Sequence, residues 1–146
     1  MGNIEDVLRI KGTRIHTISP DATVYEAIER MVERNVGSLM VTYSDGPPLG
    51  IITERDYLKK VALLGRTSRE TAVREIMSPT VITVCMSDDV DYCLGLMTEY
   101  RVRHLPVLVR GKLGGIVSVG DLVKYKLTAQ RFEIDQLTMY IQGYGS

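Results

Sequence analysis

The sequence predicts an α/β (α+β) protein built from two pseudo-symmetric β-α-β-β-α repeats that pack as one module. Two observations predict this fold. The chain repeats itself once, and each copy alternates short β-rich runs with amphipathic helical stretches. The composition agrees, because 146 residues with 45% apolar side chains are typical of a single compact globular chain.

The balanced charge and the hydropathy argue against two classes of partner. With 18 basic and 18 acidic residues, the chain lacks the basic excess of nucleic-acid-binding proteins. No apolar run approaches the roughly 18 residues that a membrane-spanning helix needs. The opening stretch MGNIEDVLRI has no basic leader or apolar signal core. We therefore expect a cytoplasmic protein, or an organellar one if a targeting segment is missing from this chain.

The internal repeat aligns residues 15–43 with residues 81–109, a shift of 66 positions. The identical pairs are Thr17/Thr83, Val24/Val90, Met31/Met97, Glu33/Glu99, Val36/Val102, Leu39/Leu105 and Val41/Val107. After a loop that is one residue shorter in the second copy, Gly50, Ile51, Asp56 and Lys59 align with Gly115, Ile116, Asp121 and Lys124. We place the first repeat at 4–65, a linker at 66–79, the second repeat at 80–128 and a helical tail at 129–146.

In the first copy, strands are expected at IHTI (15–18), SLMVTY (38–43) and LGIIT (49–53). A helix is expected to open at Thr23, whose hydroxyl caps it while Glu26 reaches back. Its apolar stripe is Val24, Ala27, Ile28, Met31 and Val32. A second helix is expected to run from Glu54 to about Leu64.

The second copy repeats this order, with strands at VITV (81–84), HLPVLV (104–109) and GGIVS (114–118). Its helices are expected to begin at Asp89 and to run from Val119 to about Leu127. The linker is polar, with a short helical patch and a stop at Pro79. In the tail, Ile134, Leu137 and Ile141 lie at helical spacing before the terminal GYGS.

Each copy places a hydroxyl three residues before a carboxylate, directly after a buried strand. These pairs are Thr53 with Asp56 and Ser118 with Asp121. One interpretation is an ordinary helix N-cap with an acidic residue in the first turn. The other is a ligand site, because a carboxylate accepts from ribose hydroxyls and free N–H groups at a helix start suit phosphate. The two roles are compatible, and two packed repeats leave clefts between them where these positions meet.

These residues carry a resemblance to a known family. The repeat period, the RHLPV run before a strand and the G-h-h-S/T-x-x-D pattern after another resemble a tandem pair of CBS (cystathionine-β-synthase) domains, from about Ile4 to Leu127. The chain is similar to small stand-alone CBS-pair proteins. The resemblance implies a non-catalytic sensor that binds an adenosine-containing ligand such as AMP, ADP, ATP, NAD(H) or S-adenosylmethionine.

The resemblance also implies positions for the ligand. The Ser/Thr and Asp pairs would hold the ribose or first phosphate, and Arg103 with His104 would face phosphate oxygens. Apart from the resemblance, Arg55 is a further phosphate candidate because it lies beside Asp56 at the helix start, and the alternative for it is a surface ion pair with Glu54 or Asp56. Backbone groups near the first strand of each copy would contact the purine. The full expected set is Ile15, His16, Thr53, Arg55, Asp56, Thr80, Val81, Ile82, Arg103, His104, Pro106, Ser118 and Asp121. Because the first copy lacks the Arg-His pair, one site or two unequal sites are expected.

Two alternatives compete with a nucleotide sensor. An enzyme is disfavoured, because the chain has no phosphate-binding glycine loop and no catalytic motif. Two histidines and two cysteines are also too few and wrongly spaced for a structural zinc site, so no metal or catalytic cofactor is expected. The second alternative is a ligand-free dimerisation and docking module. We therefore expect a regulatory module with an adenine nucleotide as regulatory ligand, forming a homodimer and modulating a partner protein such as an enzyme.

Overall fold

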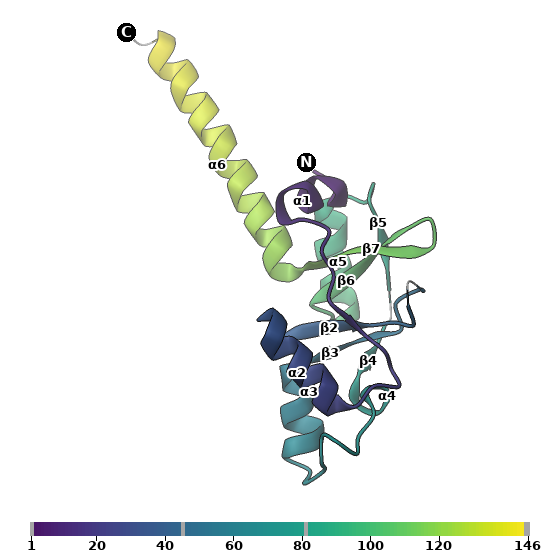
Figure 1. Ribbon diagram of the computed structural model, residues 1–146. Helices are drawn as coiled ribbons and strands as arrows, with labels where there is room; N and C mark the ends of the chain where they lie inside the picture. The colour runs from purple at the N-terminus through teal and green to yellow at the C-terminus, as the bar shows by residue number, and fades with distance from the viewer. Residues whose placement is uncertain (1, 45, 81, 145–146) are drawn as a thin grey trace.

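Each half of the chain folds around its own small sheet (Figure 1). The computed structural model describes residues 2–44, 46–80 and 82–144. Both halves run strand, helix, strand, strand, helix, so the expected α/β architecture of two repeated units is confirmed. Two separate clusters of buried apolar side chains accompany the sheets, one in each unit.

The two units match element by element. The first contains β1 (Thr17–Ile18), α2 (Val24–Arg34), β2 (Ser38–Val41), β3 (Gly50–Thr53), α3 (Glu54–Tyr57) and a π-helical continuation, η1 (Leu58–Ala62). The second contains β5 (Val84–Cys85), α5 (Val90–Tyr100), β6 (His104–Val109), β7 (Lys112–Ser118) and α6 (Val119–Tyr144). In each sheet a parallel strand pair is followed by an antiparallel pair. The sequence repeat is therefore also a structural repeat.

Helices α2 and α5 begin and end at equivalent positions. The Thr23 hydroxyl accepts a hydrogen bond from the Glu26 backbone N–H at 3.1 Å, which confirms the hydroxyl half of the predicted capping box. Both helices end on a residue with φ of 54° in the left-handed region, Asn35 in the first copy and Arg101 in the second. Asparagine adopts this conformation readily, whereas arginine does so at a cost. The repeated backbone therefore persists where the side chain does not favour it.

The buried face of α2 follows the predicted stripe with one exception. Val24, Ala27 and Met31 are buried in the first core, and Ile28 packs against it. Val32 was predicted to join them, but its side chain is 74% exposed. A helix buries an arc on one side only, and Val32 lies outside that arc.

The N-terminal helix α1 (Ile4–Lys11) was not expected from the sequence. It begins with a reciprocal cap, in which Asn3 Oδ1 accepts from the Asp6 N–H and the Asp6 carboxylate accepts from the Asn3 N–H, both at 3.0 Å. Its Ile4 and Val7 side chains are buried in the second core. The first helix of the chain therefore packs on the second unit.

The stretch expected as a linker is built into the first unit. It contains α4 (Val73–Ile76), which confirms the short helical patch, and β4 (Ser78–Pro79), which pairs with β3. Both Val73 and Ile76 are buried in the first core. Val73 stands 66 positions after Val7, so α1 and α4 are equivalent helices that each precede one unit and pack on the other. Because each of these two helices packs on the unit that it does not precede, the helices hold the two units together.

The last helix differs from the expectation that it would stop near Leu127. Instead α6 continues without a break to Tyr144 and projects from the body (Figure 1). No proline or glycine interrupts residues 121–142, so nothing local ends the helix there. Among the described residues, no helix is both long and apolar enough to cross a membrane.

Candidate functional site

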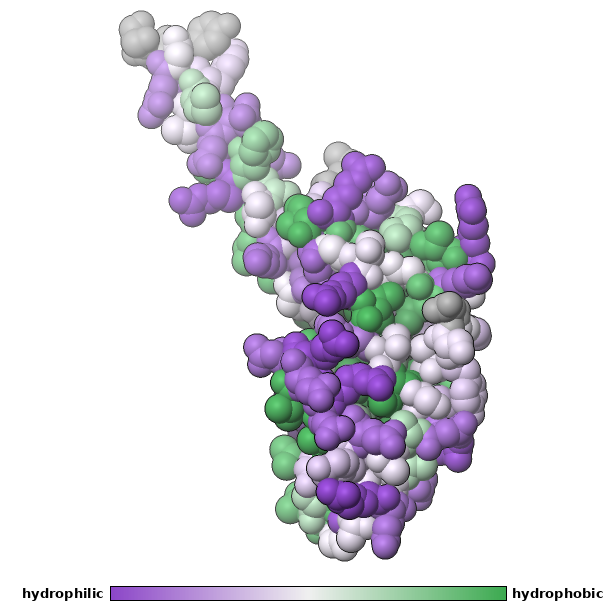
Figure 2. Space-filling view, viewed as in Figure 1, coloured by the Kyte–Doolittle hydropathy of each residue, from purple (hydrophilic) through white to green (hydrophobic). Residues whose placement is uncertain are grey.

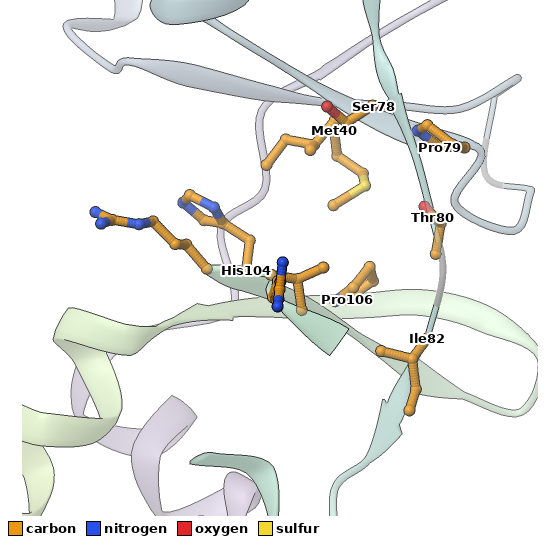
Figure 3. A pocket seen from close by; sticks show the side chains of 11 residues that line it. Met40, Ser78, Pro79, Thr80, Ile82, His104 and Pro106 are labelled. Carbon is orange, nitrogen blue, oxygen red and sulfur yellow. The ribbon is translucent and has the colours of Figure 1, made fainter. Parts of the chain in front are cut away.

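Two clefts open where the two units meet, and Met40 of β2 and His104 of β6 line both. The Arg103 cleft has a volume of about 190 Å³. Its lining comprises Met40, Ile51, Ser78, Pro79, Thr80, Ile82, Arg101, Val102, Arg103, His104 and Pro106 (Figure 3). The Asp121 cleft has a volume of about 300 Å³. Its lining comprises Lys11, Arg14, Ile15, His16, Val36, Ser38, Met40, His104, Ile116, Ser118 and Asp121.

The two clefts are equivalent positions of the repeat. Val36 and Met40 of the Asp121 cleft align with Val102 and Pro106 of the Arg103 cleft under the 66-residue shift. Both clefts therefore share an apolar wall, while their polar side chains differ. In the Arg103 cleft, the thioether of Met40 reaches into the space between the units (Figure 3).

The polar groups of the Asp121 cleft are mainly basic. Lys11 comes from the end of α1, Arg14 and His16 come from the segment before β1, and His104 comes from β6. Asp121, in the first turn of α6, is the acidic member of this lining. Within the described residues, no group of three or more histidine, cysteine or acidic side chains is placed to hold a metal ion. Because the basic side chains in this lining outnumber the Asp121 carboxylate, the cleft suits an anionic ligand.

The Asp121 carboxylate caps its own helix and also binds a distant lysine. Its Oδ2 accepts from the Ser118 N–H at 2.8 Å, and the Asp121 N–H donates to Ser118 Oγ at 3.1 Å. Lys11 Nζ donates to the same Oδ2 at 2.6 Å and to the Ile116 carbonyl at 2.7 Å. Burial by itself raises the pKa of Asp121, but the hydrogen bonds from Lys11 and the Ser118 backbone outweigh it and lower that pKa. The carboxylate is thus held ionised.

His104 is half-buried among these charges. Burial lowers the pKa of its imidazole, and the nearby charges of Lys11 and Arg103 lower it further against the opposing charge of Asp121. The free protein therefore favours the neutral ring. An anion entering either cleft would reverse part of this effect and favour the imidazolium.

The Thr53 and Asp56 pair has the same local geometry but different surroundings. Thr53 N–H donates to Asp56 Oδ2 at 3.0 Å, and the Asp56 N–H donates to Thr53 Oγ1 at 3.2 Å. The second carboxylate oxygen forms an ion pair with Lys60, one turn along, at 3.2 Å. Asp56 is buried and is not part of the lining of either cleft. Here the helix-capping interpretation accounts for the motif.

The structure brings most of the expected site residues together, in two groups. Thr80, Ile82, Arg103, His104 and Pro106 line the Arg103 cleft. Ile15, His16, His104, Ser118 and Asp121 line the Asp121 cleft. Thr53, Asp56 and Arg55 line neither, and Arg55 is exposed. Val81 lies outside the described residues. Ligand binding by any of these residues stays a prediction.

Sequence reasoning missed Lys11 and Arg14. The contact of Lys11 with Asp121 joins residues 110 positions apart in the chain. No local sequence pattern predicts this contact, because it depends on α1 packing on the second unit. The repeat could have identified Arg14, because it aligns with Thr80, which was already expected in the other cleft.

Comparison with known proteins agrees with this architecture. The CBS domain profile matches residues 4–63 and 73–128. The mitochondrial CBS domain-containing protein CBSX3 of Arabidopsis thaliana is 39% identical over 148 residues, covering 96% of this chain and 72% of that protein. A putative signal-transduction protein with CBS domains from Burkholderia ambifaria is 44% identical with a TM-score of 0.78, covering 88% of this chain and 96% of the other. A hexameric CBS-CP12 protein from bloom-forming cyanobacteria is 30% identical with a TM-score of 0.72, covering 84% and 70%.

Proposed function

The chain belongs to the CBS domain family as a tandem pair, and we propose that it senses an adenosine-containing nucleotide in the Asp121 cleft and modulates a partner protein. Tandem CBS domains are regulatory modules that typically bind adenosine ligands. Proteins of this type are generally non-catalytic, and we extend that to this chain. The ligands considered are AMP, ADP, ATP and NAD(H), each acting as a regulator.

One observation carries the proposal. The Asp121 cleft combines an apolar wall, an ionised carboxylate and four basic side chains, Lys11, Arg14, His16 and His104. A nucleoside needs the first two features, because its base packs on apolar side chains and its ribose hydroxyls donate to a carboxylate. Its phosphates need the basic groups. The Arg103 cleft lacks an acidic lining residue and is smaller, so we assign it a weaker second site.

Binding requires an exchange of partners at Asp121. In the free protein, Lys11 donates to the carboxylate oxygen that ribose hydroxyls would contact. A bound nucleotide would replace Lys11 there, and the released ammonium group would be close to the phosphates. The charge of Lys11 is then compensated in both states.

The exchange also gives a route for regulation. Lys11 ends α1, whose Val7 and Leu8 are buried in the second core. A ligand shifts a conformational equilibrium only by its difference in affinity for the two states. A change in the Lys11 contact alters the position of α1 relative to the first unit, which gives the two states different surfaces for a partner.

We also propose that the protein forms a homodimer through its helical faces. On α2 and α5, Val32 is 74% exposed and Tyr92 is 55% exposed. A second copy would cover such side chains, whereas the sheet beneath cannot. Among the relatives, the cyanobacterial CBS-CP12 protein is described as hexameric, which supports self-association. Sedimentation velocity at micromolar concentration tests this, and a monomer at every concentration contradicts it.

We propose the cytoplasm as the place of action. The alternative is an organelle, and the mitochondrial designation of the Arabidopsis relative motivates it.

Calorimetric titration of the full chain with AMP, ADP, ATP and NADH tests the nucleotide proposal. We expect saturable binding of at least one of them, weakened by Asp121→Asn and unchanged by Arg55→Ala, which lies at an exposed position outside both clefts. If none of the four binds, the protein is a ligand-free docking module, an alternative favoured by the two helix caps that already satisfy Asp56 and Asp121.

A further inference from the structure

The distal part of α6 projects from the body and carries large apolar side chains that remain exposed (Figures 1 and 2). Leu127, Ile134, Leu137 and Ile141 have exposed fractions between 59% and 66%. The helix is anchored at its other end, where Leu122 is fully buried in the second core. A fixed helix thus presents an uncovered apolar surface, separate from both clefts.

The spacing of this surface is that of a coiled coil. Counting from Val123, the positions advance by four and three residues in alternation, which is the a/d pattern of a heptad repeat. The a positions are Leu127, Ile134 and Ile141, and the d positions are Val123, Gln130 and Leu137. We call these six residues the α6 seam. It begins on the body, where Val123 is 42% exposed, and extends over three heptads.

We propose that the α6 seam binds the same seam of a second copy in a parallel, two-stranded coiled coil. Isoleucine at a with leucine at d, as in Ile134, Leu137 and Ile141, favours two parallel strands. Gln130 favours the same arrangement. In a parallel pair in register, d positions face each other, so the two amides can each donate and accept. In an antiparallel pair, Gln130 would face an apolar a residue.

The charges beside the seam are compatible with this pairing. Arg131 and Glu133 fall at the flanking e and g positions, so they leave the contact apolar. Lys126, also at g, would approach Arg131 of the second copy, but Lys126 already forms an ion pair with Asp91 of its own chain. Of the remaining exposed apolar residues on this stretch, Phe132 and Met139 fall at f and face away from the seam, and Tyr140 falls at g beside it.

This difference between seam and f positions supplies matched controls. We compare Ile134→Gln with Leu137→Gln combined in one chain against Phe132→Gln combined with Met139→Gln. All four side chains are at least 59% exposed, so neither change removes core packing. In sedimentation velocity over a concentration series, the seam variant should lose one association step, its dissociation constant rising about a hundredfold or more. The f-position variant should match the parent, and nucleotide binding should be unchanged in both.

Cross-linking tests orientation and register. In a Cys85→Ser background, with Cys93 buried, we introduce Leu137→Cys or Met139→Cys. A parallel pair in register places position 137 opposite its copy, so mild oxidation should give a covalent dimer for Leu137→Cys and monomer for Met139→Cys. Equal cross-linking at both positions, or equal self-association of the seam and f-position variants, would overturn the proposal.

Discussion

Asp121→Asn and Asp56→Asn form a matched pair of substitutions in the same motif, and they should have different consequences. Both carboxylates cap a helix through a backbone N–H, at 2.8 Å for Asp121 and 3.0 Å for Asp56. Asparagine keeps one acceptor oxygen, so it can still cap, but it loses the charge. Asp121 lines the cleft that we propose as the nucleotide site, whereas Asp56 lines neither cleft. Affinity should therefore respond only to the change at Asp121.

The magnitudes follow from the partners of each carboxylate. A hydrogen bond to a charged group contributes about 1.5–3 kcal/mol, so Asp121→Asn should weaken binding about tenfold to a hundredfold. Its unfolding free energy should fall by no more than about 1 kcal/mol, because the Lys11 pair is partly exposed. Asp56 is more buried and receives Thr53 N–H, Thr53 O–H and Lys60. Asp56→Asn should therefore cost about 1–2 kcal/mol, or roughly 3–6 °C in melting temperature.

Calorimetry and thermal unfolding of the same preparations separate the two effects. Asp56→Asn should melt lower and bind the nucleotide as the parent does. Asp121→Asn should melt nearly as the parent does and bind poorly. A 2′-deoxy nucleotide adds a control, because it should bind the parent poorly and be penalised less in Asp121→Asn. Equal affinity of the parent and Asp121→Asn, or equal loss in both variants, would refute the assignment of the ribose to Asp121.

Three further predictions concern the basic side chains. Lys11→Met should strengthen adenosine binding, because Lys11 no longer competes with the ribose for Asp121. The same change should weaken ATP binding, because the released ammonium group no longer pairs with the phosphates. Calorimetry that shows the same direction of change for both ligands would contradict the proposed replacement of Lys11 at Asp121. Arg103→Ala should weaken nucleotide binding more than Arg55→Ala, since only Arg103 lines a cleft, and the reverse order would refute this. ATP binding should take up protons as phosphate raises the lowered pKa of His104, so affinity should increase as pH falls from about 8 to about 6. Calorimetry in buffers of different ionisation enthalpy should detect this uptake, and its persistence in His104→Gln would exclude His104 as its source.

Much of the fold could be predicted because it repeats. The secondary structure predicted from a single β-α-β-β-α copy is ambiguous. Identical residues at a constant shift show that both copies have the same order of elements. The failure at α1 has a physical cause. Its apolar face is satisfied only by the second unit, so the segment before the first strand gave no reason to assign it there. Even so, Val7 aligns with Val73 at the repeat shift, which was a usable signal in the sequence, and the structure buries both side chains.

The candidate site was predictable where it depends on the local motif. The hydroxyl and carboxylate pairs lie at helix starts in both copies, with the capping bonds that their spacing indicates. Their surroundings were not predictable, because these depend on packing between units. Lys11 reaches Asp121 only because α1 packs on the second unit, and Arg14 lines the same cleft.

The two copies therefore differ mainly in the position of the lysine that pairs with the aspartate of the motif. In the first copy Lys60 stands four residues after Asp56 on the same helix, so the ion pair is local and has little reason to respond to a ligand elsewhere. In the second copy the equivalent position is Tyr125, and the cation is Lys11, at the end of a helix that precedes the first unit. Any ligand that competes for Asp121 must then act on α1. The asymmetry on which we base the proposal of the Asp121 cleft as the stronger site is therefore the same asymmetry that would couple a ligand there to α1.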